Sequence, residues 1–264
     1  MTDIYGILAY PASHSLSPLL QNAAFEMLDI DAKYDFFEIP PAELSAFMQR
    51  VRNEPIRGLS VSLPYKESIL KYLDEVDSTA RDIGAVNTIL NENGILKGYN
   101  TDTDAAIESL EEITPVSGKH IVVLGAGGAA RAIVYGLTKK HAKVTILNRT
   151  QEKAQKLAEA FFCDFGRLDQ LKNLKADILI QTTNVGMNFD CVIDSFYFKQ
   201  APRHLVVFDI IYAPRETKLI QEAVKAGLKV VTGDRMFLRQ AMRQFEIWTK
   251  QKAPFHIMER LMRI

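Results

Sequence analysis

Short apolar runs alternate with amphipathic stretches along the first hundred residues of the chain. The strand-like runs occupy residues 4–10, 33–39 and 58–63, and the helix-like patterns occupy residues 18–28, 41–51 and 67–73. Such alternation is typical of βαβ units, so we expect an α/β layer here. Residues 86–100 then predict two short strands joined at Asn93-Gly94, a pair that suits the positive φ angles of a tight hairpin.

A second series of apolar, β-branched runs begins near Lys119. Each run is too short for a helix and mostly apolar, as strands buried on both faces of a parallel sheet are. The runs occupy residues 120–125, 143–149, 176–182, 204–210 and 229–233, and helical patterns follow over residues 236–248 and 254–262. The chain therefore predicts an α/β fold built from two successive series of strands and helices.

The composition excludes a global electrostatic attraction to nucleic acid or membranes. Of 264 residues, 47% are hydrophobic, which is enough apolar material for one large or two modest cores. Lysine plus arginine and aspartate plus glutamate are balanced at 32 each, so any anionic ligand must be bound by local groups.

The cysteines and the first residues predict a cytoplasmic location. Cys163 and Cys191 have no metal-ligand spacing, and we expect free thiols without a catalytic role and no metal site. The first residues lack the basic start and long apolar run of a signal peptide. No run approaches the roughly 20 apolar residues of a membrane span.

Glycines punctuate the passage from the run at residues 120–125 to a helical pattern. Gly125, Gly127 and Gly128 would let the backbone turn tightly and approach a pyrophosphate, whose charge would then face the free amides of the helix N-terminus. Ala130 takes the third position of this fingerprint, which accepts alanine. Glycines also serve turns that bind nothing, but the strand before and the helix after favour dinucleotide binding.

The end of the next strand predicts which dinucleotide is bound. Sites for NAD usually place an acid there, which binds the ribose hydroxyls. Here the chain has Asn148 and Arg149, with Lys153 one helical turn further on. Arg149 in isolation is explained equally by an ordinary surface cation, but the missing acid favours a 2′-phosphate and therefore NADP.

Lys66 and Asp102 are the candidates for proton transfer beside a nicotinamide. Hydride transfer requires a group that gives or takes a proton, and a lysine ammonium held by an aspartate suits that role. Their spacing in the sequence does not establish that they meet. Near the start, Ser17 is a candidate N-cap with Pro18 at the first helical position, and alternatively Ser15 and Ser17 hold a carboxylate.

Eight motifs occur in an order that resembles the shikimate dehydrogenases. They read HSLSP (14–18), GLSVSLPYKE (58–67), GAVNT (84–88), GYNTD (98–102), GAGGAARA (125–132), NRT (148–150), DIIYAP with Thr217 (209–217) and GDRMFLRQA (233–241). The resemblance implies two domains. Residues 1–101 would form an α/β substrate-binding domain, completed by the C-terminal helices of residues 234–264, and residues 102–233 would form a Rossmann-type NADP-binding domain. It also implies NADPH-dependent reduction of 3-dehydroshikimate to shikimate, a step towards chorismate and the aromatic amino acids.

The same resemblance implies roles for individual residues. Lys66 and Asp102 become the catalytic pair. The residues expected to bind substrate are Ser15, Ser17, Ser62, Lys66, Asn87, Asp102, Tyr212 and Gln240. The residues expected to bind the cofactor are Gly125, Ala126, Gly127, Gly128, Ala129, Asn148, Arg149, Thr150, Lys153, Thr183, Ile210 and Gly233.

Several of these residues also have ordinary structural explanations. Asn87 could shape a bend, Tyr212 could be a core ring, and Gln240 could be a solvated helix residue. Ser60 and Ser62 depart from the family pattern, which has asparagine and threonine there, and Gln21 stands where histidine is common.

These departures leave the substrate open among shikimate, quinate and aminoshikimate. A noncatalytic sensor of NADP or shikimate is a further alternative. We expect small-molecule ligands only, with no nucleic acid or membrane partner, and a monomer or homodimer.

Overall fold

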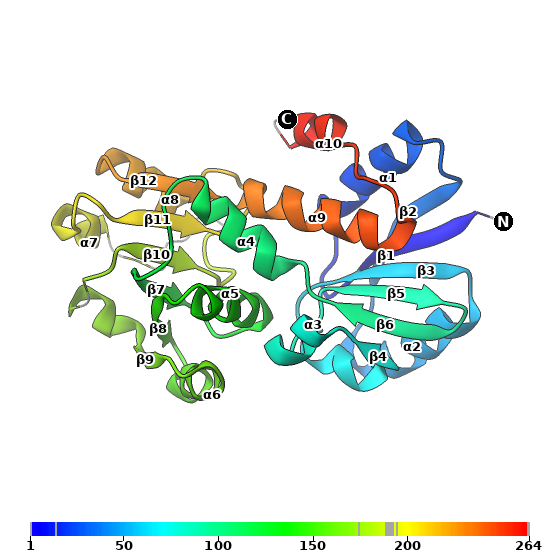
Figure 1. Cartoon of the computed structure of the whole chain (residues 1–264), viewed down its shortest axis with the longest axis horizontal. Helices are drawn as coiled ribbons and strands as arrows, with labels where there is room; N and C mark the ends of the chain where they lie inside the picture. Colours follow the sequence, from blue (N-terminus) through cyan, green and yellow to red (C-terminus); the bar gives the residue numbers. More distant parts are fainter. Residues whose placement is uncertain (1, 14, 174, 188–192, 194, 263–264) are drawn as a thin grey trace. The chain divides into compact units, whose positions relative to one another are not determined.

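The computed structural model describes residues 2–13, 15–173, 175–187, 193 and 195–262 (Figure 1). Cys191 lies outside the described residues. The chain divides into two compact units, Met1–Thr101 with Leu238–Ile264, and Asp102–Phe237.

The first unit is built on a mixed sheet with the strand order β2-β1-β3-β5-β6-β4. β1 pairs in parallel with β2 and β3, whereas β5 is antiparallel to β3 and β6. The strands are β1 (Asp3–Ala9), β2 (Ala32–Glu38), β3 (Ile56–Val61), β4 (Glu75–Val76), β5 (Thr88–Glu92) and β6 (Ile95–Tyr99). The helical segments are α1 (Ser17–Met27), η1 (Pro41–Glu43), α2 (Leu44–Asn53), η2 (Ser68–Tyr72), α3 (Ser78–Ile83), α9 (Gly233–Thr249) from Leu238 onward, and α10 (Phe255–Leu261).

The predicted hairpin is confirmed. Asn93 and Gly94 join β5 to β6 with φ angles of 55° and 91°. The Gly94 amide also donates to the Asn91 side-chain oxygen at 2.7 Å. Only glycine and a few polar residues adopt such φ angles readily, so this turn was readable from two residues.

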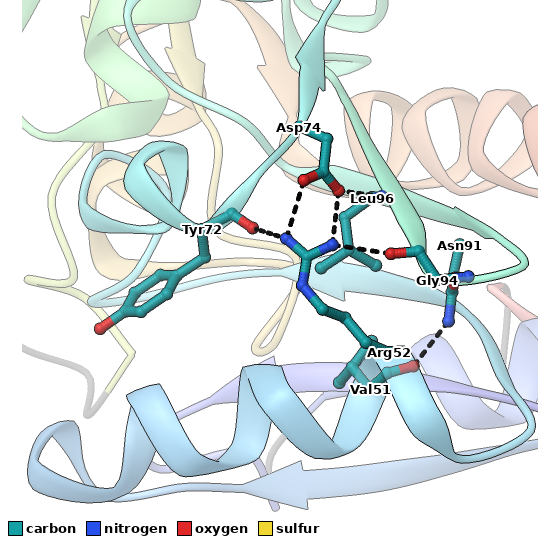
Figure 2. A network of polar contacts seen from close by, with 7 residues as sticks. All are labelled: Val51, Arg52, Tyr72, Asp74, Asn91, Gly94 and Leu96. Atoms are coloured by element: carbon teal, nitrogen blue, oxygen red, sulfur yellow. Dashed lines mark hydrogen bonds and ion pairs between the residues drawn. The ribbon is translucent and has the colours of Figure 1, made fainter.

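An arginine joins α2 to the hairpin and to η2 (Figure 2). Arg52 Nη1 donates to Asp74 Oδ2 at 2.5 Å and to the Gly94 carbonyl at 2.7 Å, and Nη2 donates to the Tyr72 carbonyl at 2.8 Å. The hydrogen bond from Arg52 holds the pKa of the Asp74 carboxyl below its ordinary value. One guanidinium thus holds three segments of the first unit together.

The C-terminal helix α9 completes the first unit through Trp248. A side chain at Gly58, in β3, would collide with the indole ring, so only glycine lets the helix lie this close. Trp248 Nε1 also donates to the Ile89 carbonyl at 2.9 Å. The helix is therefore anchored directly on two strands of the sheet.

The second unit contains a parallel sheet with the strand order β12-β11-β10-β7-β8-β9, which is the order of a Rossmann fold. Its strands are β7 (His120–Leu124), β8 (Lys143–Asn148), β9 (Asp164–Arg167), β10 (Ile178–Gln181), β11 (Val206–Asp209) and β12 (Lys229–Thr232). Its helical segments are α4 (Asp102–Glu111), α5 (Gly128–Lys139), α6 (Gln151–Phe161), η3 (Leu168–Asn173), α7 (Ser195–Gln200) and α8 (Lys218–Lys225).

Both faces of this sheet are buried, as the apolar runs predicted. Along β7, Ile121 and Val123 enter one buried cluster, and Val122 and Leu124 enter another. Successive side chains of a strand point to opposite faces, so the two clusters lie on opposite sides of the sheet.

Some elements differ from the sequence prediction. The pattern at residues 67–73 forms a 3₁₀ helix, η2, rather than an α-helix. The short strands β4 and β9 and the helix α3 were not predicted. In the described part of the chain, no helix is long and apolar enough to cross a membrane.

Candidate functional site

Lys66 lies at the end of a compact turn that follows β3. The Ser62 amide donates to the Leu8 carbonyl at 2.9 Å, and the Tyr65 amide donates to the Ser62 carbonyl at 2.8 Å. The Lys66 carbonyl accepts a hydrogen bond from the Val86 amide at 2.7 Å. This last bond places Lys66, which is half-buried, beside the residue that precedes Asn87.

Asn87 is buried and joined to Thr101. Its Oδ1 accepts from the Thr101 amide at 2.9 Å, and its Nδ2 donates to Thr101 Oγ1 at 2.9 Å. Thr101 Oγ1 in turn donates to the Gln240 carbonyl at 3.2 Å. The first unit therefore brings Lys66, Asn87 and Gln240 together, although they are far apart in the sequence.

Ser60 belongs to a buried network that sequence reasoning missed. The Tyr34 hydroxyl donates to Ser60 Oγ at 2.6 Å, and Ser60 Oγ donates to Gln244 Oε1 at 2.7 Å. Gln244 Nε2 then donates to the Asn87 carbonyl at 3.0 Å. Gln244 lies one helical turn after Gln240 and therefore on the same face of α9. This spacing in the sequence could have identified Gln244 as a second polar residue near the site.

The serine pair lies at the start of α1, with a correction to the predicted cap. The helix begins at Ser17, so its N-cap residue is Leu16, which makes no side-chain capping bond. Ser15 Oγ instead accepts the Ser17 amide at 3.2 Å and donates to Ser17 Oγ at 3.1 Å. Ser17 is therefore the first residue of the helix and not its cap, and Pro18 is the second helical residue instead of the first.

In the second unit, the glycine turn connects β7 to α5. Gly125 has φ +115°, and its amide donates to the Leu147 carbonyl at 2.8 Å. A side chain at Gly125 would collide with Thr182 Oγ1. At Gly127 an added Cβ meets no described atom within 4 Å. The turn is therefore closed on its inner side at Gly125 and open at Gly127, where a pyrophosphate can approach the first amides of α5.

The cations predicted to select NADP are exposed at the end of β8. Arg149 and Lys153 are both exposed, and no ion pair between described residues neutralises either one. Asn148 is half-buried, and its Nδ2 donates to the carbonyl of Thr150, the residue before α6, at 2.9 Å. The residues present thus fit a dinucleotide with an additional phosphate on its adenosine ribose.

Three further predicted cofactor residues lie at the carboxyl ends of neighbouring strands. The Thr183 amide donates to Gln181 Oε1 at 2.9 Å, and the Ile210 amide donates to the Gln181 carbonyl at 3.1 Å. A side chain at Gly233 would collide with the Ile210 carbonyl. Ligands of open parallel sheets bind at this edge.

The loop after β11 carries Tyr212 and is held by a buried acid. Asp209 Oδ1 accepts from the Ile211 amide at 3.1 Å, and Asp209 Oδ2 accepts from Thr217 Oγ1 at 2.7 Å. Burial raises the pKa of Asp209 to about 6. The Tyr212 ring stacks on Phe237, with 3.9 Å between the ring centroids. This stacking agrees in part with the structural explanation of Tyr212 as a core ring.

Two remaining predictions concern Asp102 and the cysteines. Asp102 is buried and begins α4 in the second unit, whereas Lys66 belongs to the first, so their pairing stays a prediction. Cys163 is a free thiol, as expected, and burial raises its pKa to about 11. It is therefore not a thiolate at neutral pH.

The parallel sheet, the glycine turn and the cations beyond it define a Rossmann-type dinucleotide-binding protein with a second α/β unit. Three family models match the chain. They are the shikimate dehydrogenase substrate binding domain over residues 7–89, shikimate / quinate 5-dehydrogenase over residues 108–229, and the shikimate 5'-dehydrogenase C-terminal domain over residues 235–263.

Relatives agree with these models over nearly the full length. A shikimate dehydrogenase (NADP(+)) of Methanothermobacter thermautotrophicus is 41% identical, over 98% of this chain and 95% of the relative. The crystal structure of shikimate dehydrogenase from Aquifex aeolicus is 40% identical, with a TM-score of 0.92 over 100% of this chain and 98% of that one. A shikimate 5-dehydrogenase from Thermus thermophilus, solved with NADP(H) and shikimate, is 34% identical, with a TM-score of 0.89 over 99% and 98%. The chain belongs to the shikimate dehydrogenase family.

Proposed function

We propose that the protein catalyses the reversible, NADPH-dependent reduction of 3-dehydroshikimate to shikimate, a step towards chorismate and the aromatic amino acids. One observation carries this proposal: Lys66, Asn87 and Gln240 lie close together in the first unit. The Val86 amide bonds to the Lys66 carbonyl, and Thr101 bonds to both Asn87 and Gln240. The first unit would bind the substrate and the second would bind NADP. Relatives named for this reaction share about 40% of the sequence over nearly its full length.

The substrate would be held at its two ends. We assign its carboxylate to the hydroxyls of Ser15 and Ser17, with Tyr212, and the N-terminus of α1 adds favourable partial charge. We assign its ring hydroxyls to the polar side chains of Ser62, Asn87, Asp102 and Gln240. Ser60 is not in this set, because its hydroxyl is already bonded to Tyr34 and Gln244.

Proton transfer is assigned to Lys66. When bound, NADPH supplies the hydride that reduces the substrate carbonyl. The Lys66 ammonium would give a proton to the oxygen that becomes the new hydroxyl, and would take it back in the reverse direction. We assign Asp102 to hold and orient that ammonium, because a carboxylate about 4 Å from an ammonium contributes about 4 kcal/mol at an effective dielectric constant of 20.

Cofactor binding is assigned to the turn and strand ends of the second unit. The amides at Gly125, Ala126, Gly127, Gly128 and Ala129 would face the pyrophosphate. Asn148, Arg149, Thr150 and Lys153 would surround the adenosine phosphate. Thr183, Ile210 and Gly233 would lie along the nicotinamide half. A cytoplasmic location and a monomeric or dimeric state remain predictions from the sequence.

One assay tests the proposal. The protein is mixed with shikimate or quinate, each with NADP or NAD, and the absorbance of the reduced nicotinamide is followed. We expect clear turnover with shikimate and NADP, and weak turnover with quinate, which has an additional hydroxyl beside its carboxylate. Equal or faster turnover of quinate would contradict the substrate assignment, and the absence of turnover with every pair would contradict an enzymatic function.

A further inference from the structure

Gln21 is a fully buried amide on α1 with one hydrogen bond made and one not. Its Nε2 donates to the Ala241 carbonyl of α9 at 2.9 Å. Its Oε1 has no hydrogen-bond partner among the described residues, and the side chain is 0% exposed. A buried acceptor without a partner is unfavourable, because it has lost its hydrogen bonds to water. An apolar side chain of similar size would fill this space without that cost, so the bond from Nε2 is the feature that requires a glutamine.

The bond connects two parts of the proposed substrate site. Ser17 lies one helical turn before Gln21, so both side chains are on the same face of α1. Ala241 directly follows Gln240, whose own carbonyl accepts the bond from Thr101 Oγ1 at 3.2 Å. Two successive carbonyls of α9 are thus held by side chains from two different segments of the first unit. Gln21 links the helix that begins at the serine pair to the turn of α9 that carries Gln240.

We propose that Gln21 is a positioning residue that sets the spacing between the serine pair and Gln240. This inference rests on the proposed function, in which the serines hold the substrate carboxylate and Gln240 holds a ring hydroxyl. A rigid substrate engages both ends only when this spacing is correct. Loss of the bond would therefore weaken substrate binding and leave cofactor binding, which is assigned to the second unit, unchanged.

The main test replaces Gln21 by methionine, which has a similar length and no amide. We expect the Gln21→Met variant to fold, since it removes the unpartnered acceptor together with the bond. Its KM for shikimate should rise by about tenfold, with kcat nearly unchanged and KM for NADP unchanged, because ground state and transition state lose the same contact. An unchanged KM for shikimate would overturn the inference.

Two further variants at the same position separate the donor from the shape of the side chain. Gln21→Leu keeps a similar volume and loses the donor, so KM should rise as in the methionine variant. Gln21→His keeps a ring N–H that can donate, so KM should stay near that of the parent protein. Equal KM values for these two variants would overturn the inference, including in the case that Gln21→Met does not fold.

Asn22 provides the matched control on the same helix. Its Oδ1 accepts from the Tyr34 amide at 2.8 Å, and its Nδ2 donates to the Tyr34 carbonyl at 2.9 Å. Both of these bonds join α1 to β2 and not to α9. Asn22→Ala should lower the free energy of unfolding and leave KM for shikimate unchanged. A rise in KM equal to that of Gln21→Met would show general loosening of α1 and overturn the inference. If the parent protein does not turn over shikimate, the proposed function fails instead.

Discussion

Asp209 makes the stability of the second unit depend on pH in a direction opposite to that of an exposed, ion-paired acid. The carboxyl is 0% exposed, and burial raises its pKa from 3.8 to about 6. At 1.36 kcal/mol per pH unit, this difference corresponds to about 3 kcal/mol that the ionised form loses on folding. The bonds from Ile211 and Thr217 favour the ionised form, but they offset only part of the effect of burial.

The sign follows from proton uptake. Between pH 3.8 and about 6 the folded chain keeps the Asp209 proton and the unfolded chain releases it. The free energy of unfolding therefore falls as pH rises through this window, and Asp209 contributes no further change above it. From pH 4.5 to 7 the fall from this group amounts to about 2 kcal/mol.

Replacement of Asp209 by asparagine removes the titration and can keep both contacts. The amide oxygen can accept from the Ile211 amide, and the amide nitrogen can donate to Thr217 Oγ1. Urea unfolding of the parent and of Asp209→Asn, followed by far-UV circular dichroism at several pH values, measures the difference between the two proteins. Other acids cancel in this difference.

We expect the variant to gain about 2 kcal/mol relative to the parent between pH 4.5 and 7. A difference that stays constant over this range would refute the reasoning, because it would mean that burial does not disfavour the charge.

Two further predictions concern catalysis and the glycine turn. Lys66→Met should lower kcat at least about 100-fold, while the dissociation constant of NADP, measured by titration calorimetry, stays within about twofold, since binding needs no proton donor. Retention of kcat would contradict the role of Lys66. Gly125→Ala should cost about 1–3 kcal/mol in urea unfolding, because of its φ of +115° and the contact with Thr182. Gly127→Ala is the matched control: it should unfold like the parent and bind NADP about tenfold more weakly, because the added methyl group blocks the pyrophosphate. Equal losses of stability for the two glycine variants would contradict this distinction.

The long elements were predictable because their signals are local. Each run in the second half carries its own burial pattern, and the hairpin at Asn93-Gly94 depends on two residues with unusual φ angles. Strand β9 had no such signal. Its sequence, DFGR, contains no apolar run, and it is a strand because it pairs with β8.

The candidate site was predictable in its residue types and only partly in its contacts. The glycine turn and Arg149 stand out because they occur together, with a strand before, a helix after and no acid of the NAD type, and Lys66 stands out because it lies in a family motif. Ser60 was one of the departures from the family pattern that left the substrate open, but its hydroxyl is bonded to Tyr34 and Gln244. A serine hydroxyl takes whichever partner lies nearest, and the partners here come from β2 and α9.

By itself, the sequence indicated the longer strands and helices, the glycine turn, and the cations after β8 that favour NADP. These properties depend on residues close together in the chain, where periodicity and glycine positions act directly. The tertiary structure alone decided that Gln21 meets Ala241, that Thr101 joins Asn87 to Gln240, and that Asp209 is buried with Thr217. Hydrogen bonds between distant segments form only after the hydrophobic faces have packed, and no local pattern encodes which polar atoms then come within reach.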